Sequence, residues 1–137
     1  MWAYMCSIKR NPNLQRQHED DAGGSQIKRV IMESKQKRRN ECMQLVRISN
    51  RNTVCEIRYS NSESKKHIDK KKEICAELIL QGKQFLTEAI FENGGRADIL
   101  VLDDFEVIEI LSSETERAFE QKKDYYPRGL NIRSVRA

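Results

Sequence analysis

Apolar positions fall into short runs that are concentrated in the C-terminal half of the chain. Two β-branched runs, Arg96 to Leu102 and Phe105 to Leu111, are separated only by Asp103 and Asp104. Two residues are the loop length of a tight β-hairpin. The pattern therefore predicts two adjacent antiparallel strands.

This hairpin fixes a pairing of acidic residues. If Leu102 faces Phe105, Asp98 lies directly opposite Glu109 on the next strand. Cross-strand partners point to the same face, with Cβ atoms ~5 Å apart. Two ionised carboxylates this close, flanked by Ile and Leu, repel each other and lose hydration unless a cation lies between them. The pairing predicts a divalent metal site.

A third strand is expected over Gln84 to Phe91, before an Asn-Gly-Gly sequence. A three-residue loop at Asn-Gly-Gly places Glu88 opposite Leu100, on the face of the other two carboxylates. A two-residue Asn-Gly turn places it opposite Ile99, on the other face. We prefer the first register, which adds Glu88 to the metal site.

Helical patterns lie on both sides of these strands. Ser62 to Leu80 carries an apolar stripe, and either Ser62 or Ser64 can cap its start. Ser113 to Tyr126 opens with a capping-box pattern, and Leu130 to Val135 alternates as a final strand. The expected order is helix, strand, strand, strand, helix, strand, which is an α/β fold with a mixed sheet flanked by helices.

The preceding part of the chain is more polar and basic. Ser25 to Asn40 predicts an amphipathic helix, and Glu41 to Ile48 with Thr53 to Tyr59 predicts a hairpin. We therefore divide the chain into an N-terminal extension over residues 1–60 and a core domain over residues 61–137.

Charge is distributed unevenly over a chain whose net charge is +4. Residues 1–60 contain 12 Lys or Arg against 6 Asp or Glu, whereas residues 61–137 contain 13 against 15. A basic arm on an acidic domain suits a phosphodiester substrate, although a solvated surface shows the same totals. The candidate nucleic-acid contacts are Lys35, Lys37, Arg38, Arg39 and Lys122.

Cysteine spacing and hydropathy argue against a structural metal site and against a membrane protein. The four cysteines form no C-x-x-C pair, so reduced and mostly buried thiols are expected rather than a structural metal site. No apolar run approaches the ~20 residues of a membrane span, and the N-terminal apolar stretch is too short for a signal peptide. We expect a soluble, cytoplasmic protein without a membrane partner.

His67 and Lys71 lie one helical turn apart on the predicted helix. Their spacing allows both side chains to point toward the carboxylates. The alternative is that His67 is exposed to solvent or satisfied by a local hydrogen bond.

Three motifs in the C-terminal half are arranged in a familiar order. Gly95 to Asp98 is a G-x-x-D string, Glu109 to Leu111 falls where (D/E)-x-K is expected, and Gln121 to Tyr125 is Q-x-x-x-Y. Together they resemble the RecB-type branch of the PD-(D/E)XK nuclease superfamily, over about residues 62–137. The resemblance implies a restriction-endonuclease-like core fold.

The resemblance also implies an activity. Members are Mg²⁺- or Mn²⁺-dependent deoxyribonucleases, in which Asp98 and Glu109 would hold the metal, with Glu88 as an additional candidate ligand. Gln121 and Tyr125 would lie near substrate and metal, although Tyr125 could equally be a core aromatic residue. Many small domains of this fold act as dimers, so a homodimer is expected.

One motif residue departs from the family pattern, because Leu111 replaces the lysine. Leucine can neither orient a water nor stabilise negative charge. Arg96 could replace the charge, and Lys123 or Lys122 could replace the lysine from the following helix. If none reaches the site, the protein is an inactive nuclease fold that binds nucleic acid. A third interpretation is an α/β domain whose carboxylates face solvent.

Overall fold

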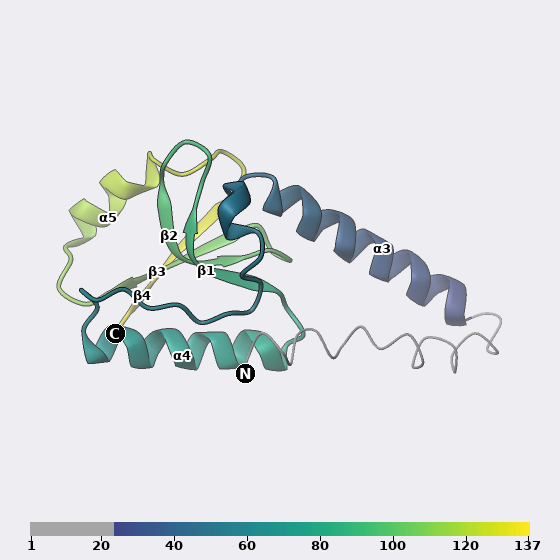
Figure 1. Cartoon of the computed structure of the whole chain (residues 1–137), viewed down its shortest axis with the longest axis horizontal. Coiled ribbons are helices and arrows are strands. Elements are labelled where there is room, and N and C mark those ends of the chain that lie inside the picture. The colour runs from purple at the N-terminus through teal and green to yellow at the C-terminus, as the bar shows by residue number, and fades with distance from the viewer. Residues whose placement is uncertain (1–23) are drawn as a thin grey trace.

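A computed structural model describes residues 24–137 of the chain. In this part, three α-helices surround a four-stranded mixed sheet with strand order β1-β2-β3-β4 (Figure 1). None of these helices is both long and apolar enough to cross a membrane. The elements are α3 (Gly24–Met43), η1 (Ile48–Asn50), α4 (Lys65–Leu80), β1 (Phe85–Ile90), β2 (Arg96–Val101), β3 (Glu106–Leu111), α5 (Glu116–Lys123) and β4 (Asn131–Arg136).

The element order from α4 onward is the predicted one. The Ser64 side chain caps α4 by accepting a hydrogen bond from the His67 backbone N–H, so the second of the two predicted caps is confirmed. Gly82 follows the helix with a positive φ of 72°, which glycine adopts without steric cost. The buried stripe of α4, which includes Ile74 and Leu78, packs on the sheet.

The predicted register between β2 and β3 is confirmed. The observed partners include Ile99 with Ile108 and Leu100 with Val107. The turn between the strands is longer than predicted, because β2 ends at Val101 and four residues precede β3. The hairpin centre is unchanged, so the alignment of the two strands is preserved.

The register between β1 and β2 differs from the preferred prediction by two residues. Thr87 pairs with Ile99 and Ala89 with Ala97, so Glu88 does not lie opposite Leu100. The loop has the predicted three residues but begins one position earlier, because the Phe91 backbone N–H bonds to the Gly95 carbonyl at 2.8 Å. Because side chains alternate between the two faces of a strand, a shift of two residues leaves each side chain on the same face of the sheet.

The predicted hairpin at residues 41–59 is wrong. Helix α3 continues through Met43, and the next segment forms the short 3₁₀ helix η1. Only an isolated bridge joins Val46 to Phe91 in this region. Cys42 lies in the last turn of α3 and Val46 just beyond the turn that follows it, and both are fully buried in the same apolar cluster.

Helix α5 leads from β3 to β4, which lie parallel. Thr115 caps α5 through the Ala118 backbone N–H, so the predicted capping box at Ser113 is wrong. The helix therefore starts three residues later than predicted. A parallel pair requires a crossover of this kind.

Two apolar clusters cover the sheet, one with α4 and one with the end of α3 (Figure 1). Segments before residue 61 contribute to both, through Cys42 and Val46 in one and Cys55 in the other. Cys42 and Cys75 are buried free thiols, as expected. Cys55 is bonded in a disulfide, which corrects the expectation of a reduced thiol there. The expectation for Cys6 lies outside the described residues.

Candidate active site

Asp98 lies where the regular pairing of the sheet is interrupted. The ladder between β1 and β2 skips Asp98, and the ladder to β3 ends at the neighbouring Ile99. Asp98 Oδ2 instead accepts a hydrogen bond from the Ile110 backbone N–H at 2.9 Å. His67 Nε2 lies 3.4 Å from the same oxygen. The carboxylate is thus fixed between β3 and α4.

Glu109 on β3 is almost completely buried, with 1% of its surface exposed. The Tyr126 hydroxyl donates a short hydrogen bond to Oε1. Burial and, after it, the neighbouring Asp98 carboxylate together raise the pKa of Glu109 to about 8. The two predicted carboxylates therefore interact, in surroundings where their repulsion is unfavourable.

Lys122 is the lysine that the structure brings to these carboxylates. Its Nζ lies 3.6 Å from Glu109 Oε2 and 3.7 Å from Glu114 Oε1. Burial lowers the pKa of Lys122, but the two glutamates outweigh that effect and raise it. Lys123 instead pairs with Glu120 at 2.9 Å. Of the two lysines considered as a replacement for the motif lysine, Lys122, which was also predicted to contact nucleic acid, is therefore the one beside the carboxylates.

Tyr126, rather than the predicted Tyr125, enters the site. Its ring is buried and meets Phe91 edge to face at 5.7 Å between centroids. Its hydroxyl reaches both Glu109 and the Arg96 carbonyl, the latter at 3.2 Å. Tyr125 is 68% exposed, which corrects the alternative that it is a core residue. Gln121 is also exposed.

The loop between β1 and β2 holds the segment that carries Tyr126. Asn93 Nδ2 donates to the Tyr125 carbonyl at 2.9 Å, and Asn93 Oδ1 accepts from the Gly95 backbone N–H at 3.0 Å. A Cβ atom at Gly95 would lie 2.5 Å from the Tyr125 carbonyl oxygen. The glycine of the G-x-x-D motif is therefore required for close backbone contact.

Glu88, a predicted metal ligand, is bound by two basic side chains. Lys71 Nζ lies 2.8 Å from Oε1, and the Arg96 guanidinium binds Oε2, with Nε at 2.6 Å. Glu88 has a left-handed φ of 52°, which is unusual for a residue with a side chain. Arg96, proposed as a substitute for the missing lysine, thus neutralises Glu88 instead.

His67 meets both interpretations, because it lies beside Asp98 and also makes a local hydrogen bond to Glu63, whereas Lys71 points to Glu63 and Glu88. His67 Nδ1 lies 3.0 Å from Glu63 Oε2. Lys71 is fully buried, and its Nζ lies 2.8 Å from Glu63 Oε1. Burial raises the pKa of Glu63, but contacts with Glu88 and Lys71 outweigh it and lower the pKa to about 2.

Asp98 and Glu109 offer carboxylate oxygens, which are the type of ligand that Mg²⁺ binds. The described residues contain no group of three His, Cys, Asp or Glu side chains arranged to hold a metal ion. Mg²⁺ is commonly bound by one or two carboxylates, with water and substrate phosphate completing its octahedron. Asp98 and Glu109 fit that mode, whereas Glu88 is already neutralised by two cations.

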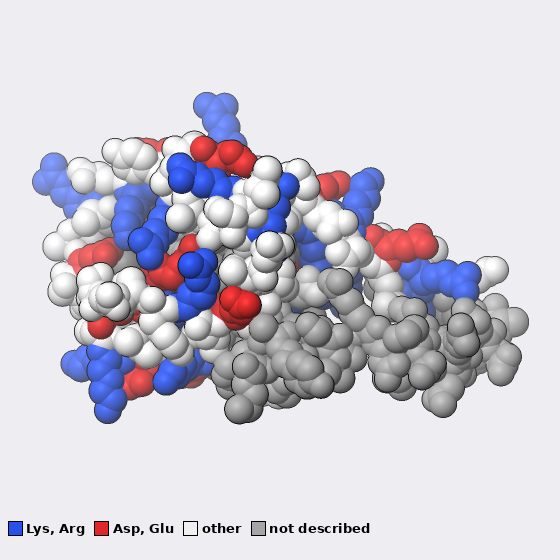
Figure 2. All heavy atoms as spheres, in the orientation of Figure 1, with Lys and Arg blue, Asp and Glu red and all other residues white. Residues whose placement is uncertain are grey.

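The predicted nucleic-acid contacts on α3 divide into two kinds. Arg39 binds both carboxylate oxygens of Asp103 at 2.9 Å, and Arg38 donates to the Asp103 carbonyl at 3.4 Å. These two arginines thus connect α3 to the turn between β2 and β3. Lys35 and Lys37 are exposed. On the face shown in Figure 2, basic and acidic side chains are interspersed.

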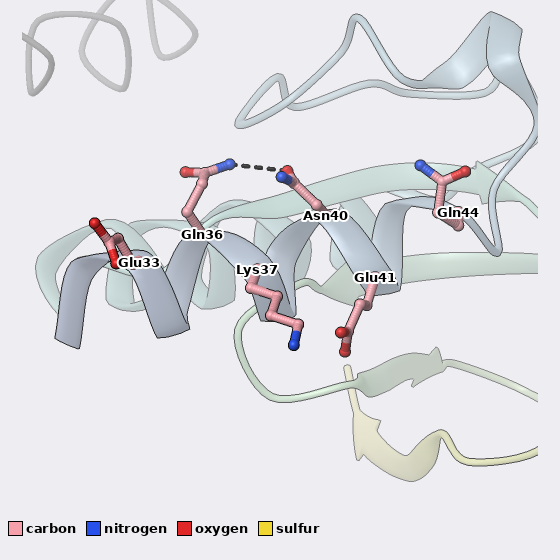
Figure 3. A pocket seen from close by; sticks show the side chains of 6 residues that line it. All are labelled: Glu33, Gln36, Lys37, Asn40, Glu41 and Gln44. Carbon is pink, nitrogen blue, oxygen red and sulfur yellow. Dashed lines mark hydrogen bonds between the residues drawn. The ribbon is translucent and has the colours of Figure 1, made fainter. Parts of the chain in front are cut away.

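A surface pocket of about 520 Å³ lies along α3 (Figure 3). Gln36 Nε2 donates to Asn40 Oδ1 across it at 2.9 Å. Its described lining residues lie on α3 except Gln44, which follows the helix directly, and none of them belongs to the acidic site. Its described lining residues are Glu33, Gln36, Lys37, Asn40, Glu41 and Gln44.

Glu63, Glu114 and Tyr126 were not predicted. Glu63, with His67 and Lys71, forms a row at intervals of four residues, which places side chains on one helical side. That spacing could have indicated Glu63. Tyr126 follows the Q-x-x-x-Y motif by one residue, and no sequence signal distinguishes it from Tyr125.

The chain matches no protein-family model, no curated protein and no solved structure. Its site geometry and topology are therefore the basis for any inference about its function.

Proposed function

We propose that the protein is a metal-dependent nuclease that hydrolyses phosphodiester bonds in DNA. The observation that carries this proposal is the interaction of the Asp98 and Glu109 carboxylates beside Lys122. A buried acidic pair is unfavourable by itself, and a divalent cation removes its repulsion. A lysine beside such a pair supplies a positive charge for a phosphate.

The topology supports the same proposal. The order α4-β1-β2-β3-α5-β4, with β3 and β4 parallel, is the order that the resemblance to PD-(D/E)XK nucleases implied. The two acids lie on the second and third strands of this order. We therefore assign the core to the restriction-endonuclease-like fold as part of the proposal.

The acidic pair and its neighbours have separable tasks in this mechanism. Asp98 and Glu109 would bind Mg²⁺, which activates a water for attack on phosphorus and neutralises charge on the phosphate oxygens. The Ile110 backbone N–H and His67 hold Asp98 in position. The Tyr126 hydroxyl donates a hydrogen bond to Glu109 Oε1, and the other carboxylate oxygen, Oε2, lies next to Lys122.

In this proposal Lys122 takes the role of the motif lysine, because Leu111 occupies the position on β3 where that lysine is expected. Leu111 is buried and apolar, so β3 offers no cation at that position. The Lys122 ammonium can donate to a phosphate oxygen and stabilise the negative charge that develops as the bond to the leaving group breaks. Arg96 has its guanidinium on Glu88 and is therefore a neutralising rather than a proton-transferring group.

The test is cleavage of labelled single-stranded, double-stranded and branched DNA in Mg²⁺ or Mn²⁺. An Asp98→Ala, Glu109→Ala double variant should lose all metal-dependent cleavage. The matched control removes two exposed acids from helices, Asp69→Ala with Glu116→Ala, and should cleave like the wild type. Cleavage that survives in the first double variant would exclude the proposal.

The buried Leu111 also favours a second candidate, a nuclease fold that binds DNA without cleaving it. This protein would bind DNA with an affinity that falls steeply with salt concentration. The same assay separates the two candidates, because the second predicts a salt-dependent complex and intact DNA in both metals.

A further inference from the structure

Lys71 occupies the space between two carboxylates next to the proposed metal site. Its Nζ lies 2.8 Å and 3.0 Å from the two oxygens of Glu63 and 2.8 Å from Glu88 Oε1. The Arg58 carbonyl accepts from the same nitrogen at 2.9 Å. An ammonium has three donors, so these partners use all of its hydrogen-bonding capacity.

The other oxygens of the two glutamates also have partners. The Arg96 guanidinium binds Glu88 Oε2. His67 Nδ1 lies 3.0 Å from Glu63 Oε2, and the Ser60 backbone N–H donates to Glu63 Oε1 at 3.0 Å. Each carboxylate oxygen therefore already has a hydrogen-bonding or cationic neighbour.

The charge balance differs between the two adjacent acidic groups. Glu63 and Glu88 face Lys71 and Arg96, so two negative charges meet two positive charges. Asp98 and Glu109, in contrast, have one lysine nearby, Lys122, which pairs with Glu109 and Glu114, and His67 lies 3.4 Å from Asp98. Only the second group retains the excess negative charge that attracts a divalent ion.

We propose that the site takes one divalent cation rather than two, because the Lys71 ammonium is a built-in cation at the position between Glu63 and Glu88. This inference rests on the proposed function, since it assumes that Asp98 and Glu109 bind the first ion. Glu88, which the sequence assigned to the metal, is then a partner of Lys71 and Arg96.

Lys71 does not take the place of the missing motif lysine. It is fully buried and its donors are used, so it cannot reach a substrate phosphate without breaking contacts to both glutamates. Leaving two carboxylates unpaired in a buried site is strongly unfavourable, because a broken buried ion pair leaves an uncompensated charge. Lys71 is therefore a positioning residue.

The experiment is calorimetric titration of the full chain with Mn²⁺, after removal of metal by a chelator. The wild type should bind one ion per chain. Asp98→Asn should weaken binding at least about tenfold, whereas Glu88→Gln should change the affinity less than about threefold. Two ions in the wild type, or an equal loss in both variants, would overturn the inference while leaving the proposed function intact.

A second variant tests Lys71 directly. Lys71→Met keeps most of the length of the side chain but removes its ammonium group, so it should leave Glu63 and Glu88 able to bind a second Mn²⁺ ion. A folded Lys71→Met protein that still binds one ion contradicts the role of Lys71. A wild type that binds no Mn²⁺ at all would instead reject the proposed nuclease function itself.

Discussion

Lys122 Nζ lies 3.6 Å from Glu109 Oε2, although the two residues come from different elements. Glu109 is on β3, and Lys122 is near the end of α5. The motif position on β3 itself holds the buried Leu111. The cation beside the acidic pair is thus supplied by the following helix, and the neighbouring Lys123 points to Glu120 instead.

Lys122→Met should therefore lower kcat for DNA cleavage by about 10²- to 10⁴-fold, the range for losing a positioned proton-transfer or charge-stabilising group. Single-turnover cleavage rates at saturating Mg²⁺ measure the effect. Lys123→Met is the matched control, since it removes the same charge one residue away, and it should keep the wild-type rate. Equal losses in both variants would indicate a general effect of positive charge on α5.

Tyr126→Phe should weaken Mn²⁺ binding by about tenfold, as expected for loss of a hydrogen bond to a metal-binding carboxylate. The substitution removes the hydroxyl that holds Glu109 but keeps the ring against Phe91. Calorimetric titration measures it, and circular dichroism checks the fold. Tyr125→Phe should bind Mn²⁺ like the wild type, because Tyr125 is exposed. A larger loss in Tyr125→Phe would restore the sequence assignment.

Sequence alone located the acidic pair because its register depends on local features. A short turn between two β-branched runs aligns Asp98 with Glu109, and the observed pairs Ile99–Ile108 and Leu100–Val107 follow that alignment. The register between β1 and β2 differs from the preferred prediction by two residues. In the observed loop Gly95 packs against the Tyr125 carbonyl, a tertiary contact that no local pattern indicates.

Other parts of the site depend on contacts that no local pattern encodes. The two-residue shift in register leaves Glu88 on the predicted face of the sheet. Its carboxylate, however, pairs with Lys71 and Arg96, so it is not available as a metal ligand. Likewise, the segment predicted as a hairpin is shaped by Cys42 and Val46 packing on the sheet. Burial by distant residues decided both outcomes.

Gly95→Ala should reduce the free energy of unfolding by about 1–3 kcal/mol, the cost of forcing an extra methyl into a packed contact. The added methyl group should push the backbone at Tyr125 away, which should displace the adjacent Tyr126 and weaken Mn²⁺ binding. Gly129→Ala is the matched control, since its φ of 90° makes alanine strained while nothing lies within 4 Å of the added Cβ. Urea unfolding should show a loss in both variants, but only Gly95→Ala should lose metal affinity.

Glu63 should make stability depend on pH in the acidic range. Its pKa in the fold is about 2, below its ordinary value of 4.5, so its stabilising contribution is fully present above about pH 4.5. The contribution should be lost as the pH falls from there toward 2. Urea unfolding of wild type and Glu63→Gln between pH 7 and pH 3 measures it, and the variant should show the weaker dependence.

The control for this experiment is Glu73→Gln, which removes an exposed partner of Lys70 on the same helix. Surface ion pairs contribute little, so this variant should keep the wild-type pH dependence. If Glu63→Gln and the wild type lose stability in parallel on acidification, the contacts of Glu63 with Lys71 and Glu88 do not govern acid stability.

Glu109→Gln should be more stable than the wild type in a chelator. Burial beside Asp98 raises the pKa of Glu109 to about 8, so at pH 7 the folded protein must either keep a buried charge or bind a proton that the unfolded chain does not bind. The amide is neutral without a proton, and its carbonyl can still accept the Tyr126 hydrogen bond. We expect a gain of about 1 kcal/mol or more in the free energy of unfolding, measured in urea with EDTA.

Millimolar Mg²⁺ should reverse this order. A ligand that binds only the folded state raises its stability, so Mg²⁺ should raise the Tm of the wild type and leave that of Glu109→Gln nearly unchanged. Glu106→Gln, at the start of the same strand and paired with Arg133, is the control and should respond to Mg²⁺ like the wild type. A wild type that gains nothing from Mg²⁺, or a Glu109→Gln variant that is less stable in EDTA, would mean that the acidic pair is stable without a cation.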